Sequence, residues 1–170
     1  MERNISNIVL VGFMGTGKTS VGKKLAEILG MNFIDTDDVI EKDYNKSISD
    51  IFAHNGEEYF RDLESAVVDK VYKLSGYVIA TGGGIVKREI NIKKLKSTGM
   101  MFCLSASPEV ILQRTSGYNH RPLLQVSDSI NHIRKLLIER EPFYACADHI
   151  IDTSNIDIDQ VVEKIISIFK

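Results

Sequence analysis

The segment from Gly12 to Thr19 has the residue types and spacing of a loop that binds polyphosphate. It reads Gly-Phe-Met-Gly-Thr-Gly-Lys-Thr and fits the pattern G-x-x-x-x-G-K-[ST]. Glycines let backbone N–H groups turn inward around phosphate oxygens, the lysine reaches the terminal phosphates, and the last hydroxyl can hold Mg²⁺. The dipole of a following helix adds to the attraction. The pattern therefore predicts a polyphosphate site in which Lys18 and Thr19 contact the phosphates and the metal.

Two carboxylates, Asp35 and Asp37, follow the second apolar run of the chain. Ligands of open α/β sheets bind at the carboxyl ends of the strands, so both groups are expected beside a ligand. Separated by one residue, they point to different sides, so one can reach Mg²⁺ or its waters while the other accepts a hydroxyl proton. The alternative is a helix N-cap followed by first-turn acids, and both interpretations can hold at once.

Three further segments carry groups suited to an anionic ligand. Arg61 and Glu64 share one face of a predicted helix; an exposed pair would stabilise the helix only weakly, but beside a pocket Glu64 would hold the guanidinium flat for a carboxylate. The glycines at 82–84 follow a strand and suit close approach of backbone amides to a ligand. Arg140 lies near the end of a helix, where it either favours the negative helix end or binds an anion.

These residues need a scaffold that brings strand ends together, and the apolar pattern supplies one. Apolar runs near 7–11, 32–35, 77–81, 100–104 and 148–151 alternate with helix-patterned sequence. That alternation predicts an α/β fold with a parallel sheet and helices on both faces. The predicted helices span residues 18–29, 37–44, 48–54, 57–74, 86–97, 108–115, 127–146 and 157–169.

The segment at about 115–124 breaks this alternation. It is polar, contains a glycine, and cannot continue a helix past Arg121-Pro122. It is predicted to be a mobile lid whose arginine closes over a triphosphate, as loops of phosphoryl-transfer enzymes do. The alternative is a plain connection between two helices.

The composition narrows the class of protein. A chain of 170 residues with 44% hydrophobic content is expected to form one domain, residues 1–170. With 21 basic and 23 acidic residues, the chain has no overall charge that would attract nucleic acid or an anionic membrane. Two cysteines are too few for a disulfide framework or a zinc site, and Cys103 is expected in the core. Neither a signal peptide nor a membrane span is expected, which predicts a cytoplasmic location.

Over nearly its full length the chain resembles the shikimate kinase family. Beside the phosphate loop, the matching segments are Asp35-Thr36-Asp37, Ile40-Glu41, Ser47-Ile48, Ile51-Phe52, Gly56-Glu57, Phe60 to Glu64, Thr81 to Gly84, Arg121 to Leu124, Glu139-Arg140 and Tyr144. The resemblance implies a three-layer α/β/α P-loop kinase fold with a five-stranded parallel sheet in the order 2-3-1-4-5, substrate-binding helices at about 37–64, and a mobile lid. It also implies ATP-dependent phosphorylation of the shikimate 3-hydroxyl to give shikimate 3-phosphate and ADP. That reaction is a step of chorismate and aromatic amino-acid biosynthesis.

The same resemblance implies a role for each matching residue. Asp37 would position and deprotonate the hydroxyl, while Lys18 and Arg121 flank the transferring phosphate. The implied shikimate-binding residues are Asp37, Phe52, Phe60, Arg61, Gly82, Gly83, Gly84 and Arg140. The implied ATP-binding residues are Gly12, Met14, Gly15, Thr16, Gly17, Lys18, Thr19, Ser20, Arg114, Arg121 and Asn155. Mg²⁺ would be held by Thr19 and, through water, by Asp35, and the protein is expected to work as a monomer on shikimate and ATP.

Other P-loop proteins are the alternatives. A nucleoside monophosphate kinase is disfavoured because Asp37, Arg61 and Arg140 suit one small acid, and a gluconate kinase because it is not expected to share Phe60-Arg61 and Arg121 to Leu124. A GTPase switch would need N-K-x-D, and the only Asn-Lys pair, at 45–46, lacks the aspartate. A catalytically silent module should lack a catalytic side chain, and none is missing.

Overall fold

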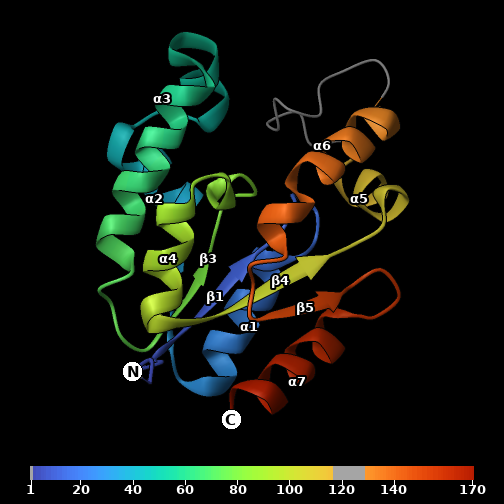
Figure 1. Cartoon of the computed structure of the whole chain (residues 1–170). Coiled ribbons are helices and arrows are strands. Elements are labelled where there is room, and N and C mark those ends of the chain that lie inside the picture. The colour runs from blue at the N-terminus through green and yellow to red at the C-terminus, as the bar shows by residue number, and fades with distance from the viewer. Residues whose placement is uncertain (1, 117–128) are drawn as a thin grey trace.

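The protein is built on one parallel sheet, seen in a computed structural model that describes residues 2–116 and 129–170 (Figure 1). The strands are β1 (Asn7–Val11), β2 (Asn32–Asp35), β3 (Tyr77–Ala80), β4 (Gly99–Ser105) and β5 (His149–Asp152), and their order is β2-β3-β1-β4-β5. All four strand pairs are parallel. The helices are α1 (Lys18–Leu29), α2 (Thr36–Tyr44), α3 (Ile48–Val71), the 3₁₀ turn η1 (Ile85–Lys87), α4 (Glu89–Thr98), α5 (Pro108–Thr115), α6 (Ser129–Tyr144) and α7 (Ile158–Phe169).

Alternate residues of the central strand β1 face opposite sides of the sheet and define two cores. Val9 and Val11 belong to a cluster with buried residues of α3, α4 and α6. Ile8 and Leu10 belong to a second cluster with buried residues of α1 and α7. Because all five residues of β1 are buried, an unbroken apolar run is what this central position requires. The three-layer fold and the strand order are confirmed.

Several helix ends lie where their residues predict. The Ser107 side chain caps α5 by accepting from the Val110 N–H at 3.3 Å, and Pro108 takes the first helical position. Asn45 ends α2 in the left-handed region, with φ 50° and ψ 41°. Cys103 is buried in the core, and this burial raises the pKa of its thiol to about 11.

Three helix predictions need revision in detail. The predicted helices at 48–54 and 57–74 are the two parts of α3, which bends at Gly56 (φ 82°, ψ 174°) and ends at Val71. The predicted single helix at 86–97 is wrong, because the extended residue Arg88 (φ −111°, ψ 118°) separates η1 from α4. The buried Asn91 side chain donates to the Ile85 carbonyl at 3.0 Å, and this contact stabilises the break. Residues 127–128 of the predicted helix 127–146, and positions 117–124 of the predicted lid, lie outside the described residues.

The carboxyl ends of all strands meet at one edge of the sheet. There α3 rises on one side and α5 and α6 on the other, while both chain ends lie toward the opposite edge (Figure 1). Ligands of open parallel sheets bind at the edge where the strands end, so the candidate residues belong there. Within the part of the chain that the structure describes, no helix combines the length and apolar composition needed to span a membrane.

Candidate active site

The phosphate loop joins β1 to α1 and leaves the start of the helix open to a ligand. Gly15 and Gly17 adopt φ values of 78° and 95°, which side chains disfavour, so the loop geometry depends on glycine. No side chain caps α1 at Gly17, and its first turn contains no acidic residue. Its first N–H groups therefore remain available to phosphate oxygens. The Lys18 ammonium lies in the same loop, donating to the carbonyls of Gly12 at 2.6 Å and Phe13 at 2.9 Å.

Thr19 and Asp35 form an oxygen-rich pair beside the loop. The Thr19 hydroxyl donates to one oxygen of the Asp35 carboxylate at 2.9 Å. The other carboxylate oxygen accepts from the Asp37 N–H at 2.9 Å and caps α2, so the N-cap interpretation is confirmed, and the contact of Asp35 with Mg²⁺ stays a prediction. Among the described residues no group of three or more His, Cys, Asp or Glu side chains could hold a metal. The Thr19 hydroxyl and the Asp35 carboxylate fit Mg²⁺, which usually binds one or two protein oxygens together with phosphates and waters.

Arg61 is a buried guanidinium held by two carboxylates of its own helix, α3. Its side chain contacts Glu64 at 2.6 Å and Glu57 at 2.9 Å, and Arg61 is only 5% exposed. Burial alone would lower the pKa of Arg61, but Glu64 and Glu57 outweigh it and raise the pKa above the ordinary value. The pair with Glu64 therefore fixes a permanently charged guanidinium at the pocket, as the second interpretation of this motif predicts.

Arg140, on α6, is buried in a different way. It is 2% exposed, and its guanidinium carbon lies 5.3 Å from the centroid of the Phe13 ring. Within residues 2–116 and 129–170 its Nη1 atom has no hydrogen-bond partner. Glu64 interacts with Arg140 electrostatically but forms no direct ion pair with it among the described residues, so the charge of Arg140 is only partly compensated and favours an anionic ligand. The interpretation that Arg140 only stabilises a helix end does not explain this burial.

The three glycines after β3 allow these charged groups to come together. A Cβ atom at Gly82 would lie 2.6 Å from Oδ1 of Asp37, and one at Gly83 would lie 3.3 Å from Nη1 of Arg140. A Cβ atom at Gly84 would overlap the Arg61 guanidinium. A Cβ atom at Gly82 would also lie 2.9 Å from Oε2 of Glu64, so a turn without side chains permits two carboxylates and two guanidinium groups to approach the same backbone.

Tyr144 fixes the middle of this turn. Its hydroxyl donates to the Gly83 carbonyl at 2.7 Å. Burial raises the pKa of the Tyr144 phenol to about 12, so the phenol stays protonated and remains a donor at neutral pH. Tyr144 lies near the end of α6, the helix that carries Arg140, and so it connects that helix to the glycine turn.

Gly84→Ala tests this steric account. The added methyl group should displace the Arg61 guanidinium and raise the KM for an acceptor carboxylate about tenfold or more, while overpacking costs roughly 1–3 kcal/mol of stability. Gly84 has φ −97°, so alanine introduces no backbone strain there. Acceptor KM and the midpoint of thermal unfolding would be measured together.

Gly30→Ala is the matched control for this prediction. It forces alanine into the left-handed region at φ 64° but meets no atom within 4 Å. It should therefore destabilise the fold by about 1 kcal/mol without changing acceptor KM. Equal KM values for the Gly84 variant and the unaltered protein would contradict the proposed contact with Arg61.

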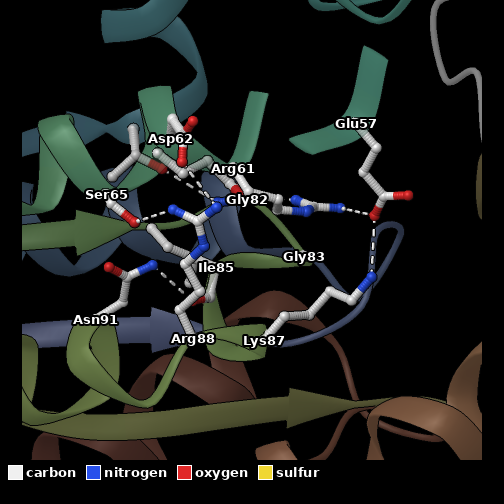
Figure 2. A network of polar contacts seen from close by, with 12 residues as sticks. Glu57, Arg61, Asp62, Ser65, Gly82, Gly83, Ile85, Lys87, Arg88 and Asn91 are labelled. Atoms are coloured by element: carbon white, nitrogen blue, oxygen red, sulfur yellow. Dashed lines mark hydrogen bonds and ion pairs between the residues drawn. The ribbon is translucent and has the colours of Figure 1, made fainter. Parts of the chain in front are cut away.

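Salt bridges fasten α3 to the segment that follows the glycine turn (Figure 2). Glu57, which holds Arg61, also accepts from Lys87 at 2.9 Å. Arg88 contacts Glu58 at 2.9 Å and Asp62 at 2.8 Å, and donates to the Ser65 hydroxyl at 3.1 Å. Individually such half-exposed pairs stabilise little, but together they fix the register of α3 against the turn. Of their basic members, Lys87 is the last residue of η1 and Arg88 separates η1 from α4.

The stabilising effect of Glu57 should depend on pH. Its hydrogen bonds with Lys87 and, to a lesser extent, Arg61 lower the pKa of Glu57 below the ordinary value of a glutamate. A lowered folded-state pKa means that the stabilisation is present above the unfolded-state pKa and is lost as the pH falls through the folded-state value. Glu57→Gln should therefore lower the unfolding midpoint at pH 7, and the difference from the unaltered protein should shrink below about pH 4.5.

Thermal unfolding from pH 3 to 8 measures this dependence. Glu89→Gln is the control, because Glu89 forms an exposed pair with Lys93 at 3.0 Å that is separate from this network. A Glu57→Gln difference that stays constant down to pH 3 would show that the carboxylate charge does not hold the network.

The charged groups line one cleft of about 1160 Å³ at the carboxyl edge of the sheet. Of the predicted site residues, the cleft is lined by Met14, Gly15, Thr16, Gly17, Lys18, Thr19, Ser20, Asp35, Asp37, Phe52, Phe60, Arg61, Gly82, Gly83, Gly84, Arg114 and Arg140. Gly12 is buried beneath the loop, and Asn155 is exposed and does not line the cleft. Arg121 lies outside the described residues. The contacts that these residues make with ligands stay predictions.

Thr153 and Ile156 line the cleft in the place predicted for Asn155. Arg114 donates to the hydroxyl of Thr153 at 3.0 Å and to its carbonyl at 2.8 Å, and also contacts the Gly15 carbonyl at 3.3 Å. Arg114 thus joins the phosphate loop to the loop after β5. The signal that sequence reasoning missed is position: Thr153 directly follows the last parallel strand, whereas Asn155 lies farther along an exposed turn.

Comparisons with known proteins agree with this geometry. Residues 14–170 match the sequence model of the family described as shikimate kinase. The chain is 53% identical over 162 residues to a shikimate kinase of Caldanaerobacter subterraneus subsp. tengcongensis, covering 95% of each chain. The chain belongs to the shikimate kinase family. It is also 50% identical to a shikimate kinase of Thermoanaerobacter pseudethanolicus, covering 97% of this chain and 96% of the relative.

Solved structures of shikimate kinases share the fold. One from Acinetobacter baumannii, in complex with shikimate, aligns with TM-score 0.93 and 38% identity over 98% of this chain and 94% of that chain. A gluconokinase from Sinorhizobium meliloti aligns with TM-score 0.59 and only 16% identity. That likeness shows a shared fold and says nothing about the substrate of this chain. The resemblance to shikimate kinases seen in the sequence is therefore confirmed.

Proposed function

We propose that this member of the shikimate kinase family transfers the γ-phosphoryl group of ATP to the 3-hydroxyl of shikimate. The observation that carries the proposal is the convergence of Asp37, Arg61 and Arg140 on a side-chain-free turn within the cleft that the phosphate loop also lines. Shikimate is a small hydroxylated ring with a single charge, its carboxylate. Two guanidinium groups suit that carboxylate, and one aspartate suits one reacting hydroxyl.

The two arginines divide the recognition of the carboxylate between them. Arg61 is oriented by Glu57 and Glu64, so it offers directed N–H groups with part of its charge compensated. Arg140 interacts with Glu64 but forms no direct ion pair within the described chain, so more of its charge remains to attract the substrate carboxylate. Phe52 and Phe60, with ring centroids 5.0 Å apart and planes tilted by 44°, wall the apolar side of the substrate ring.

Asp37 acts on the acceptor hydroxyl. It lies at the start of α2, fixed through its N–H by Asp35, with its carboxylate beside Gly82. From that position it orients the 3-hydroxyl toward the γ-phosphate and takes its proton as the new P–O bond forms. Lys18, together with Arg121 of the lid, neutralises the charge on the transferring group.

Mg²⁺ is the cofactor of this proposal. Thr19 would hold the ion directly and Asp35 through its waters, and the ion would neutralise charge on the phosphate oxygens of ATP. ATP itself is held by the N–H groups at the start of α1 and, on the far side, by Arg114 with the loop around Thr153. Because of Asn155's exposed position, we assign the adenine contacts to Thr153 and Ile156 in its place.

We further propose that residues 1–170 form one kinase domain that works as a monomer and binds no nucleic acid. The formal net charge of −2 supports the absence of nucleic-acid binding. A cytoplasmic location stays a prediction from the sequence. Sedimentation velocity across a hundredfold concentration range tests the proposed monomeric state. A monomer should sediment as one species of about 19 kDa at every concentration.

An ADP-release assay tests the substrate assignment. Shikimate, gluconate and nucleoside monophosphates are offered side by side with ATP and Mg²⁺. Only shikimate should stimulate ADP formation, and the product should carry phosphate at the 3-hydroxyl. Stimulation by gluconate or by a nucleotide in place of shikimate would overturn the proposal.

A further inference from the structure

Phe13 is a buried aromatic residue at a position of the phosphate loop where the motif accepts any residue. Its backbone carbonyl accepts from the Lys18 ammonium at 2.9 Å and from the Thr16 hydroxyl at 2.7 Å. Its ring, 1% exposed, lies in the core cluster on the α6 side of the sheet, 5.3 Å from the Arg140 guanidinium carbon. The backbone of this residue serves the phosphate side of the cleft, while its ring contacts the acceptor side.

The contact helps to hold Arg140, with which no carboxylate of the described residues forms a direct ion pair. A buried guanidinium needs compensation, and Arg61 receives it from Glu57 and Glu64. Beside Arg140, within the described residues, Glu64 and Tyr144 interact with its charge, and the face of the Phe13 ring, whose negative potential attracts a cation, adds to them. A ring face orients the guanidinium without cancelling its charge. The in-plane N–H groups, among them the unpartnered Nη1, thus remain available for a ligand oxygen.

The support is also rigid. Phe13 lies two residues after β1, the central strand, and its carbonyl is held by two donors of the same loop. A long arginine side chain loses much rotamer freedom when it binds an anion, and a fixed ring that already restricts it lowers that cost. A carboxylate in the place of the ring would neutralise the charge that the substrate needs.

We propose that Phe13 is a positioning residue for the acceptor, whose ring holds the Arg140 guanidinium ready for the shikimate carboxylate. This inference rests on the proposed function, because it takes shikimate as the acceptor and Arg140 as a ligand of its carboxylate. The competing explanation is that the ring only fills the core. The two explanations differ in whether the effect of a substitution depends on the charge of the acceptor.

The first experiment compares shikimate with its methyl ester, which keeps the hydroxyl groups and lacks the negative charge. Phe13→Leu keeps an apolar side chain and the backbone carbonyl but removes the ring face. It should raise the KM for shikimate about tenfold, as expected for a desolvated cation–π contact, and change the KM for the ester and for ATP less than twofold. Equal increases for shikimate and its ester would show that the ring only fills space and would overturn the proposal.

A second experiment avoids the loss of packing that leucine causes. Phenylalanines carrying one, two or three ring fluorines, incorporated at position 13, keep the shape of the ring and weaken its negative face stepwise. The KM for shikimate should rise with each fluorine, whereas the KM for the ester and the thermal midpoint should stay nearly constant. A KM for shikimate that does not change across the series would overturn the proposal even if the leucine variant fails to fold.

The outcomes separate this inference from the proposed function. If the unaltered protein does not phosphorylate shikimate, the proposed function fails, and the inference fails with it. If it phosphorylates shikimate but the ratio of the two KM values is the same in all Phe13 variants, only the inference fails.

Discussion

Asp37→Asn is expected to lower the turnover number by a factor on the order of 10² to 10⁴, the usual contribution of a positioned general base. Asparagine keeps the size of the side chain but cannot take the proton of the acceptor hydroxyl. The phosphate loop is untouched, so the affinity for ATP should stay within about twofold of the unaltered value. Single-turnover kinetics and calorimetric ATP binding measure the two quantities on the same protein.

Asp43→Asn provides the control for this variant. Asp43 lies on the same helix, α2, and pairs with Lys70 at 3.2 Å on an exposed surface. Its substitution should leave both quantities unchanged. Near-normal turnover by the Asp37 variant would show that Asp37 is not the base and that the acceptor hydroxyl is activated by another group.

Lys18→Met is expected to reduce turnover on the order of 10³-fold, because phosphoryl transfer depends on cations that neutralise the transferring group. The ammonium lies within the loop, against the carbonyls of Gly12 and Phe13, so its charge is presented where the phosphates are proposed to bind. Methionine keeps a similar apolar stem without the charge. Shikimate affinity in the absence of nucleotide should be unaffected, and equilibrium binding measures it.

Lys23→Met is the control, because it removes one positive charge from the same helix without removing the Lys18 ammonium. Lys23 is an exposed residue of the same helix, α1, and does not line the cleft. Turnover of this control should match that of the unaltered protein. A Lys18 variant that loses shikimate affinity but keeps turnover would show that Lys18 binds shikimate and not the transferring phosphate.

Much of the fold could be predicted because its signals are local. The apolar runs end within one or two residues of the observed strands, and the phosphate loop is a continuous segment whose glycines dictate its shape. The break at Arg88 was missed because its cause is not local. Arg88 is held out of a helix by carboxylates of α3 and by the turn that Asn91 stabilises, contacts that helical periodicity cannot register.

The contacts of the site likewise divide into local ones, which could be predicted, and non-local ones, which could not. Arg61 with Glu64 could be predicted because three residues on a helix share a face. The support of Arg140 by Phe13 could not, since one residue follows β1 and the other lies on α6, and only the packing of the sheet brings them together. The sequence could not distinguish Asn155, which does not line the cleft, from Thr153, which does, because spacing within a loop carries no periodic signal.

A crystal structure with ADP, Mg²⁺ and shikimate tests most directly whether the cleft binds nucleotide at the phosphate loop and shikimate at the two arginines. The proposed function predicts the shikimate carboxylate between the guanidinium groups of Arg61 and Arg140, and the 3-hydroxyl within hydrogen-bond distance of Asp37, facing the phosphate loop. A carboxylate bound away from both arginines, or a 3-hydroxyl directed away from Asp37, would contradict it.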